Sequence, residues 1–243
     1  MKNSFAQSQI NRFSKNFGGT LKGIADPYVS GYGFIYFDYL PPALPSGRSN
    51  GGYINGMPSA SLSIPEIQNL LSAQMLGVTP PGGTLNKIEF TGLGGTKWAV
   101  PGNIDYGNTI SIKFLEMDHL PITSIIHSWV KMIRDYRTGV TDDLEMYASG
   151  TGYSKKDYAA VLYYWTTAPD GKTVEYSACY DGVFPTKDPQ DLFSHDVETV
   201  GRLDVEIEFS LDYIWQEDWV RQKCQGFADA LMSDKDKIKQ QHG

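Results

Sequence analysis

Two glutamates, Glu206 and Glu208, are the residues whose type and spacing come closest to a catalytic pair. On a strand, residues i and i+2 point to the same side and lie about 7 Å apart. That separation is within the range of the two carboxylates of a glycosidase. They belong to a row of acids with Asp204 and Asp212, and such a row more often forms a solvated or field-generating face. We therefore assign no catalytic residue and keep a glycosidase or glycan-binding module as the alternative of another class.

The histidines and cysteines do not form a recognisable site. No HxH or HExxH spacing occurs, and Asp118-His119 has no nucleophile spaced with it, which favours a local hydrogen bond or cap. His127 is expected on a solvated flank of a helix. Cys179 and Cys224 form no CxxC and are expected to be reduced, partly buried thiols. The sequence predicts no metal site and no cofactor.

Charge and composition restrict the possible partners. The 243 residues carry a formal net charge of −7, and 13% of them are aromatic, which suits a β-rich protein. A net-acidic protein is a poor candidate for gripping nucleic acid, because phosphate binding depends on Lys and Arg. The N-terminus lacks the apolar core of a signal peptide, and no apolar run approaches the roughly 18 residues of a membrane span. We expect a protein of the cytosol, or one assembled there.

The acidic row lies on the most regular stretch of the sequence, residues 202–215 (RLDVEIEFSLDYIW). Apolar residues occupy one parity: Leu203, Val205, Ile207, Phe209, Leu211 and Tyr213. Acids and one serine occupy the other parity. This alternation predicts one long strand with a buried apolar face and an acidic face.

Two helices are predicted, and the tail over 216–243 could form a third that packs on a neighbour or on its own sheet. Apolar residues recur at helical spacing over residues 121–137, and the apolar face of this helix is expected to meet the long strand or the opposite sheet. The candidate core residues are Ile126, Trp129, Ile133, Val205, Ile207 and Phe209. A second helix is expected to begin after Ser63, with Pro65 and Glu66 in its first turn, and to stop at Gly77.

Six further runs are predicted strands: residues 34–40, 85–93, 97–100, 109–117, 158–166 and 173–181. The last two are joined by Pro169-Asp170-Gly171, which is typical of a hairpin turn. Gly92, Gly94 and Gly95 suggest a phosphate cradle, but strand sequence follows them instead of a helix N-terminus. We expect an arm over 1–27, one domain over 28–215 with an insertion over 41–77, and an extension over 216–243.

Four segments carry a family resemblance. They are residues 71–92 (LSAQMLGVTPPGGTLNKIEFTG), 104–118 (IDYGNTISIKFLEMD), the helix around IIHSWVKMIRDY, and 180–215, from YDGVFPTKDPQDLFSHD to RLDVEIEFSLDYIW. In these segments the chain resembles the contractile-tail tube proteins of tailed phages, a family related to the haemolysin-coregulated tube protein of type VI secretion. The last segment is the most specific, because it is similar to the family's closing Gly-aromatic-Pro, strand and Asp-Tyr-Trp elements. The chain departs from the compact family pattern by its longer arm, an insertion over 41–66 and the tail after Trp219.

The resemblance implies a mainly β fold, an antiparallel β-sandwich or barrel with a flanking α-helix. To this the chain adds an N-terminal arm, an inserted helix and a C-terminal extension. It also implies that six copies form a ring and that rings stack into a tube through which DNA passes without specific binding. The implied partners are further copies, the tail sheath, and baseplate and neck proteins, without a membrane. The implied location is the virion tail after assembly in the host cytoplasm. A neck, tail-terminator or baseplate-end ring of the same fold is the alternative.

The acidic face has two possible positions under this resemblance. It could line the lumen, where carboxylates repel phosphate and let DNA slide, or it could meet Lys or Arg of a neighbouring subunit. The candidate residues for lumen or subunit contact are Asp204, Glu206, Glu208, Asp212, Lys87, Glu89, Gly94 and Gly95. The sequence alone leaves both positions open.

Overall fold

The computed structural model describes residues 31–42, 44, 62–92, 95–118, 120–134, 154–189 and 204–242. The expected arm over 1–27, most of the 43–62 loop, Gly94 and His119 lie outside the described residues. The predicted mainly β fold with antiparallel sheets and a flanking helix is confirmed.

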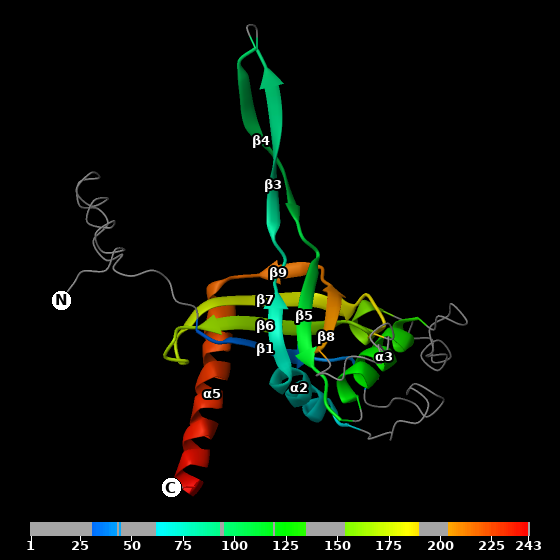
Figure 1. Cartoon of the computed structure of the whole chain (residues 1–243), viewed down its shortest axis with the longest axis vertical. Coiled ribbons are helices and arrows are strands. Elements are labelled where there is room, and N and C mark those ends of the chain that lie inside the picture. Colours follow the sequence, from blue (N-terminus) through cyan, green and yellow to red (C-terminus); the bar gives the residue numbers. More distant parts are fainter. Residues whose placement is uncertain are drawn as a thin grey trace, which may run out of the picture.

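The body is a seven-stranded antiparallel sheet in the order β1-β6-β7-β8-β5-β2, with β9 paired to β7 off this path. The strands are β1 Gly33–Tyr39, β2 Met75–Thr79, β5 Thr109–Leu115, β6 Ala160–Thr167, β7 Val174–Pro185, β8 Asp204–Ser210 and β9 Tyr213–Trp215. In Figure 1 the β1-β6-β7 strands cross the β2-β5-β8 strands at a steep angle. Within the described chain the sheet is not closed: β1 and β2 end the main path, and β9 is paired on one side, with β7.

Strand β7 joins the two halves of the sheet. Its first part pairs with β6 and β9, whereas Phe184 and Pro185 pair with β8. Gly182 lies at the register shift with β6, between Asp181 and Val183 and just before the part paired with β8. Its φ of 72° falls in the left-handed region that side chains disfavour. A Cβ at Gly182 would also lie 2.5 Å from Oδ2 of Asp212. Glycine is therefore required where the sheet turns its corner.

The long strand predicted over 202–215 is two strands, β8 and β9. Beyond Ser210, the Leu211 amide donates to Asn108 and the Asp212 amide donates to Asp181, so the chain leaves β5 and moves to β7. At this point the alternation of buried and exposed residues shifts by one position: Tyr213 and Trp215 are exposed, whereas Ile214 packs against the core. The expectation that Tyr213 is buried together with Leu203, Val205, Ile207 and Phe209 is therefore wrong.

Helix α2, Ile64–Ala73, begins as predicted at Ser63. The Ser63 amide and hydroxyl both donate to Oε2 of Glu66, at 2.6 and 2.7 Å. The predicted stop at Gly77 is wrong, because the chain from Met75 onward forms β2. The unpaired edge of β5 offers ladder hydrogen bonds, which an extra helical turn would forgo.

Helix α3, Pro121–Ile133, is started by a buried carboxylate. Glu116 accepts hydrogen bonds from the amides of Ile122 and Thr123, at 3.1 and 2.8 Å. The amides at a helix N-terminus lack backbone partners, so this carboxylate satisfies groups that would otherwise be buried unpaired. The predicted continuation of the helix is wrong at Arg134, whose backbone is extended with φ −161° and ψ 118°, and residues 135–137 lie outside the described residues.

The main core lies between the two halves of the sheet and helices α2 and α3. The rings of Phe37, Trp129 and Phe209 pack together, with centroid distances of 6.0 to 6.2 Å. Trp129 also donates its indole N–H to the Tyr158 carbonyl at 2.7 Å. The other predicted core residues lie around these rings: Ile126, Val205 and Ile207 are buried, and Ile133 is partly buried.

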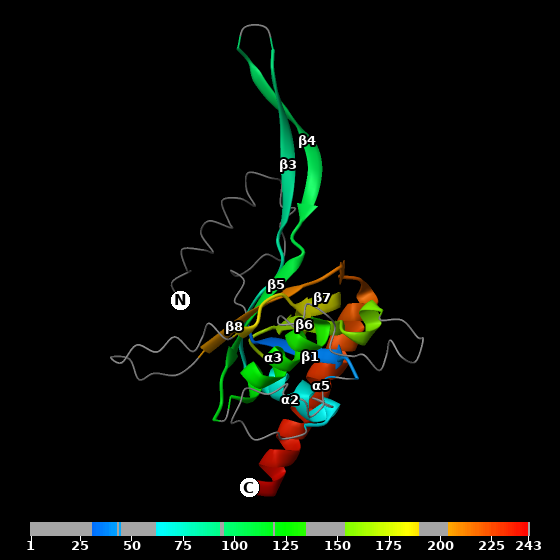
Figure 2. The same cartoon turned by 90° about the vertical axis from the view of Figure 1, so that its right-hand side faces the viewer.

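A second, smaller cluster lies on the other face of the sheet, beneath helix α5, Asp218–His242. Its members are Tyr163, Trp165, Val174 and Cys179 from the sheet and Val220, Cys224 and Ala228 from the helix. The extension predicted over 216–243 therefore packs, in its first half, on its own sheet. Figure 1 and Figure 2 show α5 continuing past the body to the C-terminus.

A long hairpin of β3, Gly83–Thr91, and β4, Lys97–Tyr106, forms a separate two-stranded sheet. The predicted pair of strands around a glycine turn is present, and its second strand is longer than the predicted 97–100. In both Figure 1 and Figure 2 the hairpin projects from the body on the side opposite to the C-terminus.

Candidate assembly surfaces

The acidic row lies on the solvent face of β8, next to β5. Glu206 is opposite Lys113 in the register, and Glu208 is opposite Ser111. The Ser111 hydroxyl donates to Oε1 of Glu206 at 2.8 Å, and Nζ of Lys113 lies 3.2 Å from Oδ2 of Asp204. With three acids and one lysine along this ladder, the face carries a net negative charge.

Asp212 does not lie with the other three acids of the row. It follows the break between β8 and β9, where its Oδ2 lies 2.6 Å from Nζ of Lys155 and against Gly182. The sequence placed it on the acidic face because the alternation runs through the break without interruption. In the fold, Asp212 instead secures the corner of the sheet.

The β3–β4 hairpin exposes large apolar side chains in its described part: Leu85, Ile88, Phe90, Trp98, Val100 and Ile104. Residues opposite each other in an antiparallel pair share a face. The register pairs Ile88 with Val100 and Phe90 with Trp98, so these four form one apolar face. We call them the hairpin face. Trp98 is 58% exposed, and its ring lies 5.2 Å from that of Phe90.

The polar residues predicted for this region lie elsewhere on the hairpin. Lys87 and Glu89 form an ion pair on the other face, opposite Pro101 and Ala99, and Gly95 lies in the turn with a φ of 81°. The sequence reasoning named these polar residues and missed the hairpin face. The missed signal was the alternation of Ile88 and Phe90 with Lys87 and Glu89, together with its mirror in β4.

An exposed apolar face on a two-stranded hairpin indicates a surface that binds a partner. An isolated hairpin is at best marginally stable in water, and contiguous exposed apolar patches mark interaction sites. Within the described chain nothing covers the hairpin face, because each of its four residues is exposed. The hairpin is therefore the strongest candidate contact surface of the molecule.

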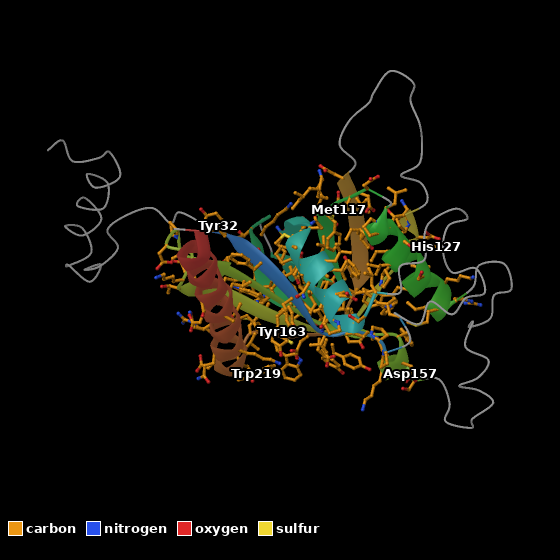
Figure 3. All side chains as sticks on the ribbon, turned by 90° about the horizontal axis from the view of Figure 1, so that it is seen from below. Tyr32, Met117, His127, Asp157, Tyr163 and Trp219 are labelled. Atoms are coloured by element: carbon orange, nitrogen blue, oxygen red, sulfur yellow. The ribbon has the colours of Figure 1, made fainter. Side chains whose placement is uncertain are left out.

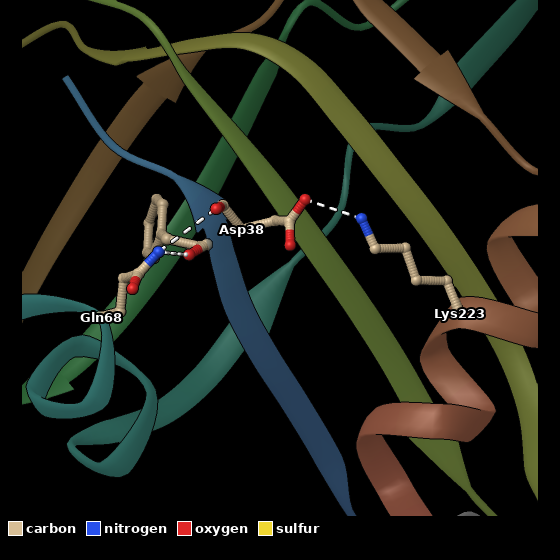
Figure 4. Close-up of polar contacts among 4 residues, drawn as sticks. Asp38, Gln68 and Lys223 are labelled. Atoms are coloured by element: carbon tan, nitrogen blue, oxygen red, sulfur yellow. Dashed lines mark hydrogen bonds and ion pairs between the residues drawn. The ribbon is translucent and has the colours of Figure 1, made fainter. Parts of the chain in front are cut away.

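Strand β1 is held between α2 and α5 by polar contacts (Figure 4). The Gln68 side-chain amide donates to the carbonyls of Phe37 and Asp38, at 2.6 and 3.3 Å. The Asp38 carboxylate accepts a 2.7 Å hydrogen bond from Nζ of Lys223, which also lies over the ring of Tyr163. Gln68 thus connects α2 to the sheet edge, and Lys223 connects α5 to it.

Burial raises the pKa of Tyr163, Cys179 and Cys224 at the contact between α5 and the sheet. The pKa of Tyr163 rises to about 12, that of Cys179 to about 11 and that of Cys224 to about 12, in each case chiefly because burial disfavours the charged form. Both cysteines are free and buried. They remain protonated at neutral pH and pack as small apolar groups.

His127 is not on a solvated flank, so that prediction is wrong. It is buried on α3, and its Nδ1 lies 2.8 Å from Oδ2 of Asp188, which follows β7. Seen from below, His127 and α3 lie at one end of the body, whereas α5 with Tyr163 and Trp219 lies at the other (Figure 3).

No group of three or more metal-ligating side chains occurs among the described residues. Within the same residues, no helix is long and apolar enough to span a membrane.

No protein-family model matches the sequence, and no curated protein matches it. Among solved structures, the chain is similar to a chain of the sheath/tube terminator of an extracellular contractile injection system, PVC, in its extended state. Identity is 12% and the TM-score is 0.39, over 80% of this chain and 99% of the other. A chain of the anti-feeding prophage baseplate gives 9% identity and a TM-score of 0.39, over 80% and 97%. A chain of the anti-feeding prophage cap gives 12% and 0.38, over 81% and 100%. Similarity at this level does not determine a function.

Proposed function

We propose that this protein is a structural subunit of a contractile tail, a tail tube protein whose copies form hexameric rings that stack into a tube. The observation that carries the proposal is the projecting hairpin with its uncovered apolar face, since such a surface calls for a partner. The resemblance of four sequence segments to tail tube proteins supports the same role. No catalytic residue, metal or cofactor is assigned.

The solvent face of β5 and β8 suits the lumen of such a tube. Glu206 and Glu208 are exposed there, and the single lysine, Lys113, is engaged by Asp204. A lumen with net negative charge repels the phosphates of DNA and lets it slide. The tail sheath, baseplate and neck proteins are the further partners proposed, in the virion after assembly in the host cytoplasm.

Electron microscopy of the purified full-length protein tests the assembly. We expect hollow tubes or stacks of six-fold rings. A protein that stays monomeric at all concentrations and salt conditions would contradict the proposal. A neck or terminator protein of the same fold is the second candidate, favoured by the extra helix α5 at one end of the molecule. That candidate predicts single rings that do not elongate.

Charge reversal tests the acidic face. In the double variant Glu206→Lys, Glu208→Lys, a lumen position predicts tubes that bind double-stranded DNA in a sedimentation assay, whereas wild-type tubes do not. A position between subunits predicts loss of assembly instead. The matched control, Glu175→Lys with Glu217→Lys, changes the net charge equally on exposed surfaces outside both the acidic face and residues 229–242 of α5. Unchanged assembly and unchanged DNA binding in the test variant would remove both roles.

A further inference from the structure

We propose that the free end of helix α5 in one copy packs against the hairpin face of the next copy along the stack. We call residues 229–242 of the helix the α5 tail. This pairing presupposes the tube function proposed above and names the partner of the hairpin. Three features of the molecule support it: a helix stripe that continues past the sheet, the opposite directions of the two elements, and their matching lengths.

The apolar stripe of α5 continues beyond the part that the body covers. Val220, Cys224 and Ala228 are buried against the sheet, at 0 to 3% exposure. Leu231 is the next residue on the same stripe, three and seven positions after Ala228 and Cys224. It is 51% exposed, and in Figure 1 the helix continues past the sheet toward the C-terminus. Among the described residues of the copy, the stripe is therefore not covered at Leu231.

The hairpin and the α5 tail project from opposite ends of the body in both Figure 1 and Figure 2. They cannot meet within one copy. In copies stacked head to tail, the tail of one copy points toward the hairpin of its neighbour, so the proposed contact lies between copies. Heterologous contacts of this kind propagate an open assembly instead of closing a dimer.

The two projecting elements are also similar in length. The α5 tail is about 21 Å long at 1.5 Å per residue. The part of β3 from Leu85 to Thr91 spans about 23 Å at 3.3 Å per residue. The first half of α5 already packs its stripe on a sheet face, against Trp165 and Cys179. Packing of the tail on the hairpin face would continue the same helix-on-sheet contact across the copies.

Substitution at the exposed end of the stripe gives the first test. Leu231→Glu should abolish tube elongation, leaving single rings or short stacks in electron micrographs. Ser233→Glu is the matched control, because this exposed residue lies about 200° around the helix from Leu231 and should elongate normally. Urea unfolding of both variants should match the wild type, since neither site is buried. Elongation of the Leu231→Glu variant at the wild-type rate and length would overturn the pairing.

Disulfide cross-linking gives the second test. The double variant Gly92→Cys, Lys235→Cys keeps Trp98 and Leu231 and places one thiol beside each surface. A Cβ at position 92 would lie 3.8 Å from Nε1 of Trp98, and position 235 is about one helical turn beyond Leu231. Oxidation of assembled tubes should therefore yield a ladder of linked multimers on a non-reducing gel. Either single variant should give dimers at most. The native cysteines are buried and should not contribute. Tubes that form normally but give no ladder would overturn the pairing alone, whereas failure of the wild type to form rings or tubes would contradict the proposed function itself.

Discussion

Two hairpins of this protein share residue types and have opposite surroundings. The β6–β7 and β3–β4 hairpins both carry aromatic and β-branched residues, and both turn at glycine-containing loops. Trp165 in β6 is 1% exposed, whereas Trp98 in β4 is 58% exposed. The difference arises from neighbours, because β6 and β7 lie inside the sheet with α5 on one face and the main core on the other.

The contrast separates two uses of apolar surface. In β6–β7 the apolar side chains are buried within one copy, so removing them should reduce folding stability. In β3–β4 the apolar side chains are exposed in the single copy, so removing them should reduce assembly. The hairpins therefore offer a matched pair of tryptophans for distinguishing a stabilising contact from an assembly contact.

Trp165→Ala should give the largest loss of stability. The ring stacks on Phe34 at 5.6 Å and contacts Phe227 of α5 at 5.7 Å. Replacing such a buried tryptophan with alanine costs about 3 to 5 kcal/mol. Urea unfolding followed by circular dichroism measures the change. A cost below about 1 kcal/mol would show that this face of the sheet is not the second core described above.

Gly182→Ala should give the next largest loss. The left-handed backbone at this corner costs a residue with a side chain about 1 to 3 kcal/mol, and the new Cβ would displace Asp212. The matched control is Gly226→Ala in α5, where a Cβ meets open space. The control should stabilise by about 0.5 to 1 kcal/mol, because glycine is unfavourable within a helix. Equal effects of the two substitutions would contradict the corner assigned to Gly182.

Alkaline pH should loosen α5 from the sheet. The pKa values of Cys179, Cys224 and Tyr163 are raised to about 11, 12 and 12 in the folded protein, from 9.0, 9.0 and 10.0. The folded state therefore holds these protons more tightly than the unfolded state, so stability falls as pH rises above about 9 and continues to fall toward 12. Urea midpoints at pH 7.5, 9 and 10 measure the trend. Cys224→Ala should flatten it, and an unchanged slope would show that burial of this thiol is not its source.

Trp98→Ala should have the smallest effect on folding. Exposed substitutions away from a core usually change stability by less than about 0.5 kcal/mol. The same variant should lose tube elongation, if the hairpin face is an assembly contact. Thr91→Ala, on the opposite face of the hairpin, is the control and should assemble normally. A Trp98→Ala variant that loses several kcal/mol of stability would instead place the hairpin in the core of the single copy.

Local chemistry was readable from the sequence wherever neighbours in the chain decide the conformation. The start of α2 at Ser63 follows from the spacing to Glu66. The turn after β6 follows from Asp170, whose carboxylate accepts the amides of Lys172 and Thr173 at 2.9 and 3.1 Å. Alternation over Asp204–Ser210 correctly predicted a strand, and its three apolar residues are buried.

The candidate surfaces were only partly predictable. Three of the four acids share one face, but Asp212 lies at the corner with Lys155. The hairpin was expected, yet its exposed apolar face was not recognised. The sequence alternates apolar and polar residues in the same way whether the apolar side is buried or exposed. His127 was misplaced because the segment after β7, which supplies Asp188, is far away in the sequence.

By itself, the sequence determined the mainly β class, the helix over 121–133, the hairpin turns and the strand that carries the acids, because each depends on residues a few positions apart. Only the tertiary structure decided that this strand breaks at Leu211, that Gly182 turns the sheet, and that one hairpin is buried while the other projects. The physical reason is that strand pairing and burial are settled by distant segments competing for the same edge or face. Periodicity within one segment carries no information about that competition.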